Sequence, residues 1–144
     1  MKTRIKKILI DKINRSLWWH VTPRDSTAYK KRGKFLASTY DQASFYGRPN
    51  DIPERVKISN PLCAISEVKI LKILFPKDYK KLYASVIDID DRKDWYKRRI
   101  MLDSKMYQKA KSRGHDAIVL LGSNANKYLV RNRKPRFIEL NLCK

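Results

Sequence analysis

Glycine, cysteine and histidine are scarce in this chain of 144 residues, and each shortage argues against a class of site. Four glycines form neither a phosphate-binding loop nor a dinucleotide fingerprint, which need several glycines in one short motif. The two cysteines, Cys63 and Cys143, lie far apart and are typical of an intracellular protein without a disulfide framework. His20 and His115 have no cysteine or carboxylate at the spacing of a zinc site, so we expect no metal.

Long apolar runs are also missing. No stretch approaches the roughly 18 apolar residues of a membrane-spanning helix. The basic N-terminus is followed by only a short apolar run, residues 8–10, which is too short for the core of a signal peptide. We therefore expect a cytoplasmic protein with no transmembrane segment.

Acidic residues are few, and this is the most unusual feature of the composition. Against 34 lysines and arginines stand 14 aspartates and glutamates, which leaves a net charge of +20. Such an excess directs a protein towards polyanions: DNA, RNA, an anionic membrane or an acidic protein partner. The alternative is a charged surface that reflects only a lysine-rich proteome. The hydrophobic share of 42% predicts a packed core, which we expect to form one monomeric domain over residues 1–144.

Hydrophobic periodicity and turn residues predict the elements along the chain. Residues 1–15 form a basic amphipathic segment that either docks on the core or lies on a membrane or nucleic acid. The predicted helices cover 2–15, a segment after Ser38 or Thr39 that carries Tyr46, 66–75, 79–86 and a long segment from Asp90 to a C′ residue at Gly114. The predicted strands cover 17–22, 34–37, 56–58, 116–121, 128–130 and 137–142, with turns at 60–62 and 122–126. This order favours an α+β fold with a mixed sheet.

Five short segments form a set of motifs in a fixed order. They are residues 19–22 (Trp-His-Val-Thr), 33–38 (Gly-Lys-Phe-Leu-Ala-Ser) with Tyr46 on the next helix, 60–62 (Asn-Pro-Leu), 114–119 (Gly-His-Asp-Ala-Ile-Val) and 136–141 (Arg-Phe-Ile-Glu-Leu-Asn). The set resembles the ADP-ribosyltransferase superfamily, in the branch of poly(ADP-ribose) polymerases and of small phage and toxin-system enzymes. That branch has His-Gly-Thr/Ser, Gly-x-Tyr/Phe-Phe-x-Asp, Asn-Pro-Leu, Gly-Tyr-Asp-Gly-Ile-Val and Glu-Tyr-Val-Val-Phe-Asn in the same order.

The resemblance implies a mainly antiparallel sheet with flanking helices and an NAD site. His20 would donate a hydrogen bond to the adenine-side ribose, the Val21 backbone would hold the nicotinamide carboxamide, and Thr22 would add a hydroxyl. Tyr46 would lie against the nicotinamide ring with Phe35 behind it. The resemblance also assigns Gly33 and Ser38 to the cofactor site. The reaction it implies breaks the nicotinamide–ribose bond through an oxocarbenium-like state.

Three positions depart from the family pattern. Val21 replaces the usual glycine, and Phe35 replaces the commoner tyrosine. Alignment of the last motif puts Arg136 where the catalytic glutamate belongs. Glu139 is the nearest carboxylate, and it lies an odd number of residues away, so it would face the other side of an unbroken strand unless a bulge shifts the register. We take Glu139, with His20 and Tyr46, as the candidate catalytic set, and the alternative for Glu139 is a solvent-facing strand residue.

Three functions compete. The first is an NAD-dependent mono-ADP-ribosyltransferase, a glycosyltransferase that modifies a protein or nucleic acid. The second is a catalytically inactive form of the fold that binds DNA or RNA through its basic surface, and the third is a phage-type protein that docks on a host complex. Basic residues near aromatic ones are the candidate target-binding residues; they are Lys30, Lys31, Arg32, Arg98, Arg99, Arg131, Arg133 and Arg136.

Overall fold

The computed structural model describes residues 3–87, 92–121 and 138–143, and from 92 to 95 it describes the backbone alone. The helices in these ranges are α1 (Thr3–Arg15), α2 (Ala28–Arg32), α3 (Tyr40–Ala43), the short 3-10 helix η1 (Ser44–Tyr46), α4 (Glu67–Leu74), α5 (Tyr79–Ile87) and α6 (Arg92–Ser112). The strands are β1 (Trp19–His20), β2 (Lys34–Ala37), β3 (Pro61–Ala64), β4 (Ala117–Leu121) and β5 (Ile138–Leu142).

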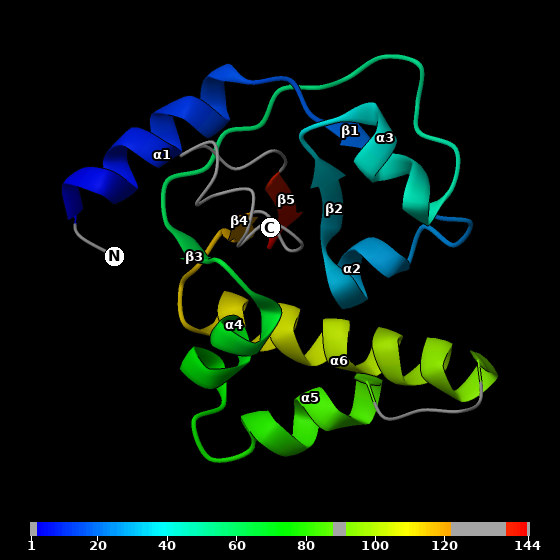
Figure 1. Ribbon diagram of the computed structural model, residues 1–144. Coiled ribbons are helices and arrows are strands. Elements are labelled where there is room, and N and C mark those ends of the chain that lie inside the picture. The colour runs from blue at the N-terminus through cyan, green and yellow to red at the C-terminus, as the bar shows by residue number, and fades with distance from the viewer. Residues whose placement is uncertain (1–2, 88–91, 122–137, 144) are drawn as a thin grey trace, which may run out of the picture.

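The five strands form one sheet in the order β1-β2-β5-β4-β3 (Figure 1). Neighbours β1 and β2, β2 and β5, and β5 and β4 are antiparallel, while β4 and β3 are parallel. The expected α+β fold with a mixed, mainly antiparallel sheet and flanking helices is therefore confirmed. Strand β5 is the middle strand of the sheet, between β2 and β4. The burial of each β5 side chain therefore depends on which helices pack on the face to which it points.

Helix α1 covers one face of the sheet. Its buried Ile13 packs in a cluster with Trp18, Leu36, Val119 and Leu140. The register pairs Leu36 with Leu140 and Leu140 with Val119, and directly paired side chains point to the same face, so these three form one row across the sheet. Trp18 also donates its indole N–H to the Ile13 carbonyl at 2.9 Å, which fixes the end of α1 against the sheet.

Helices α4, α5 and α6 cover the other face (Figure 1). Leu62 of β3 and Ile118 of β4 are paired and pack there with Ile70, Met106 and other buried residues of these helices. The helices cover mainly the β3 and β4 side of this face, because α4 contacts β3 and α6 contacts β4. Short α3 contacts β1 and β2 instead. The β5 strand lies between these two coverings.

Local sequence signals correctly predicted the start of α4 and the end of α6. Ser66 caps α4 by accepting from the Lys69 N–H at 3.3 Å. Helix α6 ends in a Schellman motif at the predicted C′ glycine: Gly114 has φ of +83°, its N–H bonds the Lys111 carbonyl at 3.0 Å, and the His115 N–H bonds the Ala110 carbonyl at 3.0 Å. No helix in the part of the chain that the structure describes combines the length and apolarity needed to cross a membrane.

Three predicted elements were wrong in kind or length. The predicted turn at 60–62 ends in strand β3, because Asp116 accepts the backbone N–H groups of Ser59 and Asn60 and aligns this segment with β4. The predicted strand at 56–58 joins no ladder, although Val56 and Ile58 are buried as its alternation required. The strand predicted at 17–22 is shorter in the structure, where β1 covers only residues 19–20. The predicted turn at 122–126 and strand at 128–130 lie outside the described residues.

Candidate functional site

Glu139 lies on β5 and belongs to the sheet face that carries α3 and α6. Its pairing partners are Ala37 of β2 and Leu120 of β4, and Leu120 packs against the core under α4, α5 and α6. Trp19 of β1 pairs with Ala37, so Trp19, Ala37, Glu139 and Leu120 form one row across the sheet. The carboxylate is half-buried in this row. It therefore does not behave as a free solvent-facing side chain.

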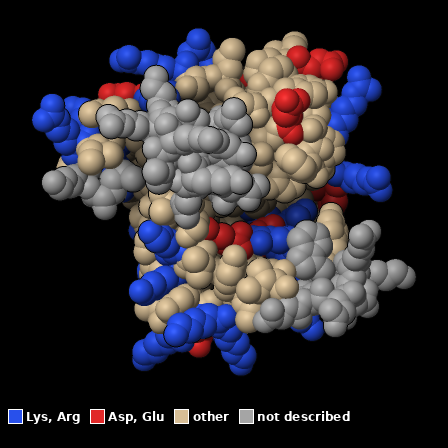
Figure 2. Space-filling view, in the orientation of Figure 1, with Lys and Arg blue, Asp and Glu red and all other residues tan. Residues whose placement is uncertain are grey.

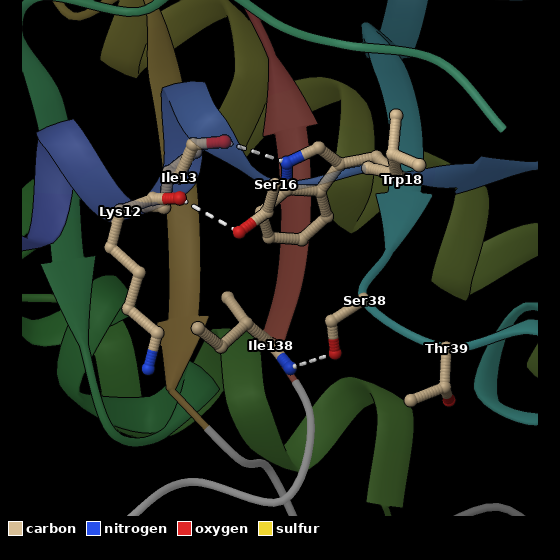
Figure 3. Close-up of a pocket in the computed structure, with 8 residues that line it drawn as sticks. Lys12, Ile13, Ser16, Trp18, Ser38, Thr39 and Ile138 are labelled. Carbon is tan, nitrogen blue, oxygen red and sulfur yellow. Dashed lines mark hydrogen bonds between the residues drawn. The ribbon is translucent and has the colours of Figure 1, made fainter.

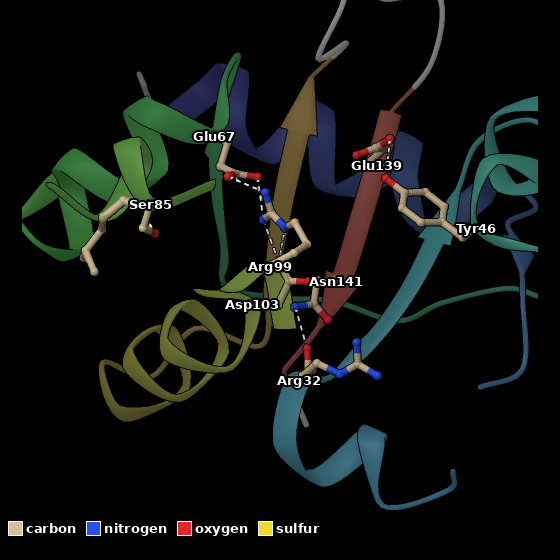
Figure 4. A network of polar contacts seen from close by, with 9 residues as sticks. Arg32, Tyr46, Glu67, Ser85, Arg99, Asp103, Glu139 and Asn141 are labelled. Carbon is tan, nitrogen blue, oxygen red and sulfur yellow. Dashed lines mark hydrogen bonds and ion pairs between the residues drawn. The ribbon is translucent and has the colours of Figure 1, made fainter. Parts of the chain in front are cut away.

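Two side chains of the α3–η1 segment bond the Glu139 carboxylate. The amide Nε2 of buried Gln42 donates to Oε1 of Glu139. The Tyr46 hydroxyl donates to the same oxygen at 3.2 Å, as Figure 4 shows. We call these three residues the Glu139 cluster. The structure thus brings together Tyr46 and Glu139, two of the three predicted catalytic residues, which are 93 positions apart in the sequence.

The α3–η1 segment is anchored over the sheet by a cap and by buried side chains. Thr39 caps α3 by accepting from the Gln42 N–H at 3.1 Å, and Ala43 is buried. Ser44 donates its hydroxyl to the Asp41 carbonyl at 2.6 Å at the start of η1. Sequence reasoning expected a helix carrying Tyr46 after Ser38 or Thr39, and the cap at Thr39 confirms where it begins.

The hydroxyl of Tyr46 is a donor that keeps its proton. The ring is largely exposed, but its hydroxyl end is turned onto Glu139. Desolvation at that end and the neighbouring carboxylate both disfavour a phenolate, and together they raise the pKa of Tyr46 well above its ordinary value. Tyr46 can therefore hold the Glu139 carboxylate in place, while its exposed ring remains available for stacking on a ligand.

A second polar group lies close to the first. Arg99 of α6 makes two bonds to Glu67 of α4, at 2.7 and 2.8 Å, and bonds Asp103 one turn further along α6 at 2.6 and 3.1 Å (Figure 4). We call this the Arg99 clamp. Desolvation raises the pKa of Asp103 against the opposing effect of Arg99. Arg99 and Asp103 both influence the pKa of Tyr46, so the clamp lies within electrostatic range of the Glu139 cluster.

His20 is buried, and both of its ring nitrogens have partners. Nδ1 lies 2.7 Å from the Phe35 carbonyl, which can only accept, so Nδ1 carries a proton there. Nε2 lies 2.9 Å from the Tyr29 hydroxyl of α2, and in the neutral ring it accepts from that hydroxyl. His20 makes no described contact with the Glu139 cluster, and the nitrogen that could reach a ribose is occupied by Tyr29.

The other residues of the first motif approach the segment after Tyr46. The Thr22 hydroxyl donates to Oδ1 of Asn50 at 3.1 Å, and the Asn50 N–H bonds the His20 carbonyl at 2.8 Å. Val21 packs close to Gly47, where an added Cβ would meet the Val21 Cγ1 at 3.0 Å. The strand that ends at His20 is thereby tied to the segment that presents Tyr46.

Gly33 and Ser38, at the two ends of β2, have structural partners. Gly33 has φ of +81°, and a Cβ built on it would meet Oδ1 of Asn141 at 2.2 Å. Ser38 accepts the Ile138 N–H at 2.7 Å and so extends the β2–β5 pairing. The alternation of β2 puts Phe35 on the face of Glu139 and Ser38 on the face of α1. Phe35 therefore shares a face with the Glu139 cluster, and Ser38 does not.

Ser38 also lines a pocket on the α1 side of the sheet (Figure 3). Its lining residues are Lys12, Ile13, Ser16, Leu17, Trp18, Ser38, Thr39 and Ile138, and its volume is about 180 Å³. Pockets for drug-sized ligands usually measure about 300–1,000 Å³. This pocket therefore does not provide a site of the size that a dinucleotide needs.

The predicted target-binding residues divide into four groups. Lys30 and Lys31 of α2 and Arg98 of α6 are exposed. Arg32, the last residue of α2, is half-buried. Arg99 is held in its clamp and is not free to contact a target. Arg131, Arg133 and Arg136 lie outside the described residues. The placement of Arg136 at the position of the family glutamate therefore stays a prediction. Figure 2 shows lysines and arginines around the rim of the view and a recess with acidic and basic side chains between its upper and lower halves.

Two contributors to the site, Gln42 and the Arg99 clamp, are not predicted by the sequence. The spacing of Arg99 and Asp103, four residues apart on a helix, was a signal for the second half of the clamp. No local signal pointed to Gln42, whose partner Glu139 is 97 residues away. Comparisons with protein families, with curated proteins and with solved structures found no match to this chain.

Proposed function

We propose that this chain is an NAD-dependent mono-ADP-ribosyltransferase that acts inside the cell as a monomer, and that its sheet and helices are a form of the ADP-ribosyltransferase fold. The observation that carries the proposal is the contact between Glu139 and Tyr46. A half-buried carboxylate beside an exposed aromatic ring supplies what the reaction needs: a fixed negative charge and a flat surface.

In this proposal Glu139 takes the role of the family glutamate. Its carboxylate accepts a hydrogen bond from the ribose 2′-hydroxyl and offsets the positive charge that develops on the ribose as nicotinamide leaves. Gln42 and Tyr46 supply the donors that hold the carboxylate ready before NAD binds. The Tyr46 ring lies against nicotinamide, and Phe35, exposed on the same face of the sheet, packs behind it.

The proposal makes a specific demand on His20. Its Nε2 is occupied by the Tyr29 hydroxyl, so a ribose hydroxyl binds there only after Tyr29 moves away. Because Nδ1 carries the proton, Nε2 accepts, so the bond that the resemblance implies is reversed: a ribose hydroxyl replaces the phenol as donor to Nε2. In this proposal the Val21 backbone holds the nicotinamide carboxamide and Thr22 adds a hydroxyl. Both residues directly follow β1 and contact the segment after Tyr46.

The test is nicotinamide release from labelled NAD by the purified chain, with a host lysate and mixed nucleic acid as acceptors. Glu139→Gln should keep the fold and lower the rate by at least about 100-fold, because the lost charge matters mainly in the transition state. Glu54→Gln is the matched control, since Glu54 is also a half-buried carboxylate but pairs with Lys34 away from the cluster. Wild-type turnover that Glu139→Gln leaves unchanged would contradict the assignment.

The second candidate function is binding without catalysis. It is favoured by His20, because a histidine whose two nitrogens are both bonded within the protein is typical of a structural role. In that case the exposed cations hold DNA, RNA or an acidic host complex, and NAD is not turned over. Wild-type nicotinamide release at background level, together with intact binding of a polyanion, would favour this function over the first.

A further inference from the structure

Phe45 is unusually exposed for an aromatic residue. On η1 it precedes Tyr46, and the two side chains are 81% and 64% exposed. Phe35 and Tyr40 nearby are also exposed, so four aromatic rings are accessible within twelve residues of sequence. Phe45 is the most exposed of the four, and it is the ring that we consider for contact with a ligand.

The geometry of η1 makes the side chains of Phe45 and Tyr46 point in different directions. A 3-10 helix has three residues per turn, so consecutive side chains point about 120° apart. The hydroxyl of Tyr46 is fixed on Glu139, and Phe45 therefore points away from the Glu139 cluster while remaining next to it. The residues just before η1, Gln42 and Ala43, are buried, so they anchor the segment that carries Phe45.

The charge of the molecule identifies the kind of partner. Arg48 follows η1 and is exposed, and Lys30 and Lys31 are exposed on α2. The whole chain carries +20. An exposed aromatic ring followed by an exposed arginine, on a strongly basic protein, suits a polyanion that has flat apolar groups, which is a single-stranded nucleic acid. In a duplex the faces of the bases are covered by their neighbours, so a duplex offers the ring nothing to stack on.

We infer that Phe45 stacks on an unpaired base of single-stranded DNA or RNA, and that this strand is the acceptor at the Glu139 site. The second half of the inference rests on the proposed function, and the first does not. In the transfer, the bond between the ribose carbon and the nicotinamide nitrogen breaks and its electron pair leaves with nicotinamide. A nitrogen or oxygen of the base bonds that carbon, and the proton it loses passes through Glu139 to water.

The experiment measures binding of a fluorescein-labelled mixed-sequence oligonucleotide by anisotropy, without NAD, as single-stranded DNA, single-stranded RNA and the DNA duplex. Phe45→Ala should weaken binding of at least one of the two single strands about tenfold, as expected for one lost stacking contact. It should leave duplex binding unchanged. The matched control is Ile87→Ala, which removes an exposed apolar side chain of α5 and should leave all three affinities unchanged.

The outcomes separate the two proposals. If Phe45→Ala binds both single strands as tightly as wild type, or weakens duplex binding equally, stacking by Phe45 is wrong. If label from NAD on a lysate resists nuclease and is removed by protease, the acceptor is a protein and the second half is wrong. If nicotinamide release is absent but Phe45→Ala still weakens single-strand binding, the proposed function fails and the stacking role stands.

Discussion

Among single residues, Gly33 has the tightest surroundings of the three glycines that the structure describes, all of which have positive φ. Its φ of +81° and ψ of −169° are typical of glycine alone. An added Cβ would meet Asn141 Oδ1 at 2.2 Å, the Leu142 carbonyl at 2.5 Å and the Tyr107 ring at 2.9 Å. The resemblance assigns Gly33 to the cofactor site, but these contacts by themselves explain why the position requires glycine.

We therefore expect Gly33→Ala to lower the free energy of unfolding by at least about 3 kcal/mol, through backbone strain and overpacking together. Gly114→Ala separates the two effects, because Gly114 also has positive φ (+83°) but an added Cβ there meets nothing within 4 Å. It should cost only about 1–2 kcal/mol. Urea unfolding of both variants measures the difference, and equal losses would show that the contacts around Gly33 add nothing.

The side of the sheet that Glu139 faces could not be settled from the sequence. Alternation along the strand relates Glu139 to Arg136, but it does not say which of the two faces the Tyr46 helix. The pairing of Glu139 with Ala37 and Leu120 decides the face, and both partners are distant in sequence. The contact with Tyr46 depends on a helix that packs across this face, and helix packing leaves no local signal in a single sequence.

Among the elements, the Arg99 clamp joins α4 to α6. Arg99, Glu67 and Asp103 have side-chain exposures of 25%, 20% and 15%, so the three charges are largely withdrawn from water. Removal of the guanidinium would leave two carboxylates close together without their shared partner. That loss is costly when ions are mostly buried.

Arg99→Ala should lower the free energy of unfolding by about 2–4 kcal/mol for this reason. Arg98→Ala is the matched control, because Arg98 is the preceding residue on the same helix and is exposed; its effect should stay within about 0.5 kcal/mol. Urea denaturation followed by circular dichroism tests both. Equal effects of the two substitutions would mean that the clamp does not hold α4 and α6 together.

Elements with local signals were predicted well, and those that depend on distant partners were not. The cap at Ser66 and the glycine at position 114 fix the ends of α4 and α6 from nearby residues alone. In contrast, Pro61 is typical of a turn, but in the structure it begins strand β3. Asp116 accepts the backbone N–H groups of the two preceding residues and so aligns them beside β4. Residues 56–58 show the reverse, since a buried alternating segment can pack on the sheet without pairing to it.

On the scale of the whole molecule, the net charge of +20 is the dominant physical property. Three ion pairs occur among the residues that the structure describes, and Arg99 takes part in two of them. Many cations of α1, α2 and α6 are exposed. Their combined field attracts a polyanion over distances comparable to the Debye length, about 8 Å at physiological salt.

Binding of single-stranded nucleic acid should therefore depend steeply on salt, because each neutralised phosphate releases condensed counterions. If about six phosphates are neutralised, the logarithm of affinity should fall with the logarithm of salt at a slope of about −4, and a threefold rise in salt should cost about 100-fold in affinity. Anisotropy titrations at several salt concentrations measure the slope. An oligonucleotide of the same bases with an uncharged methylphosphonate backbone is the control, since it has no counterions to release. A flat dependence for the natural strand would mean that the charge of this protein does not drive its binding, and that any affinity comes from stacking and hydrogen bonds alone.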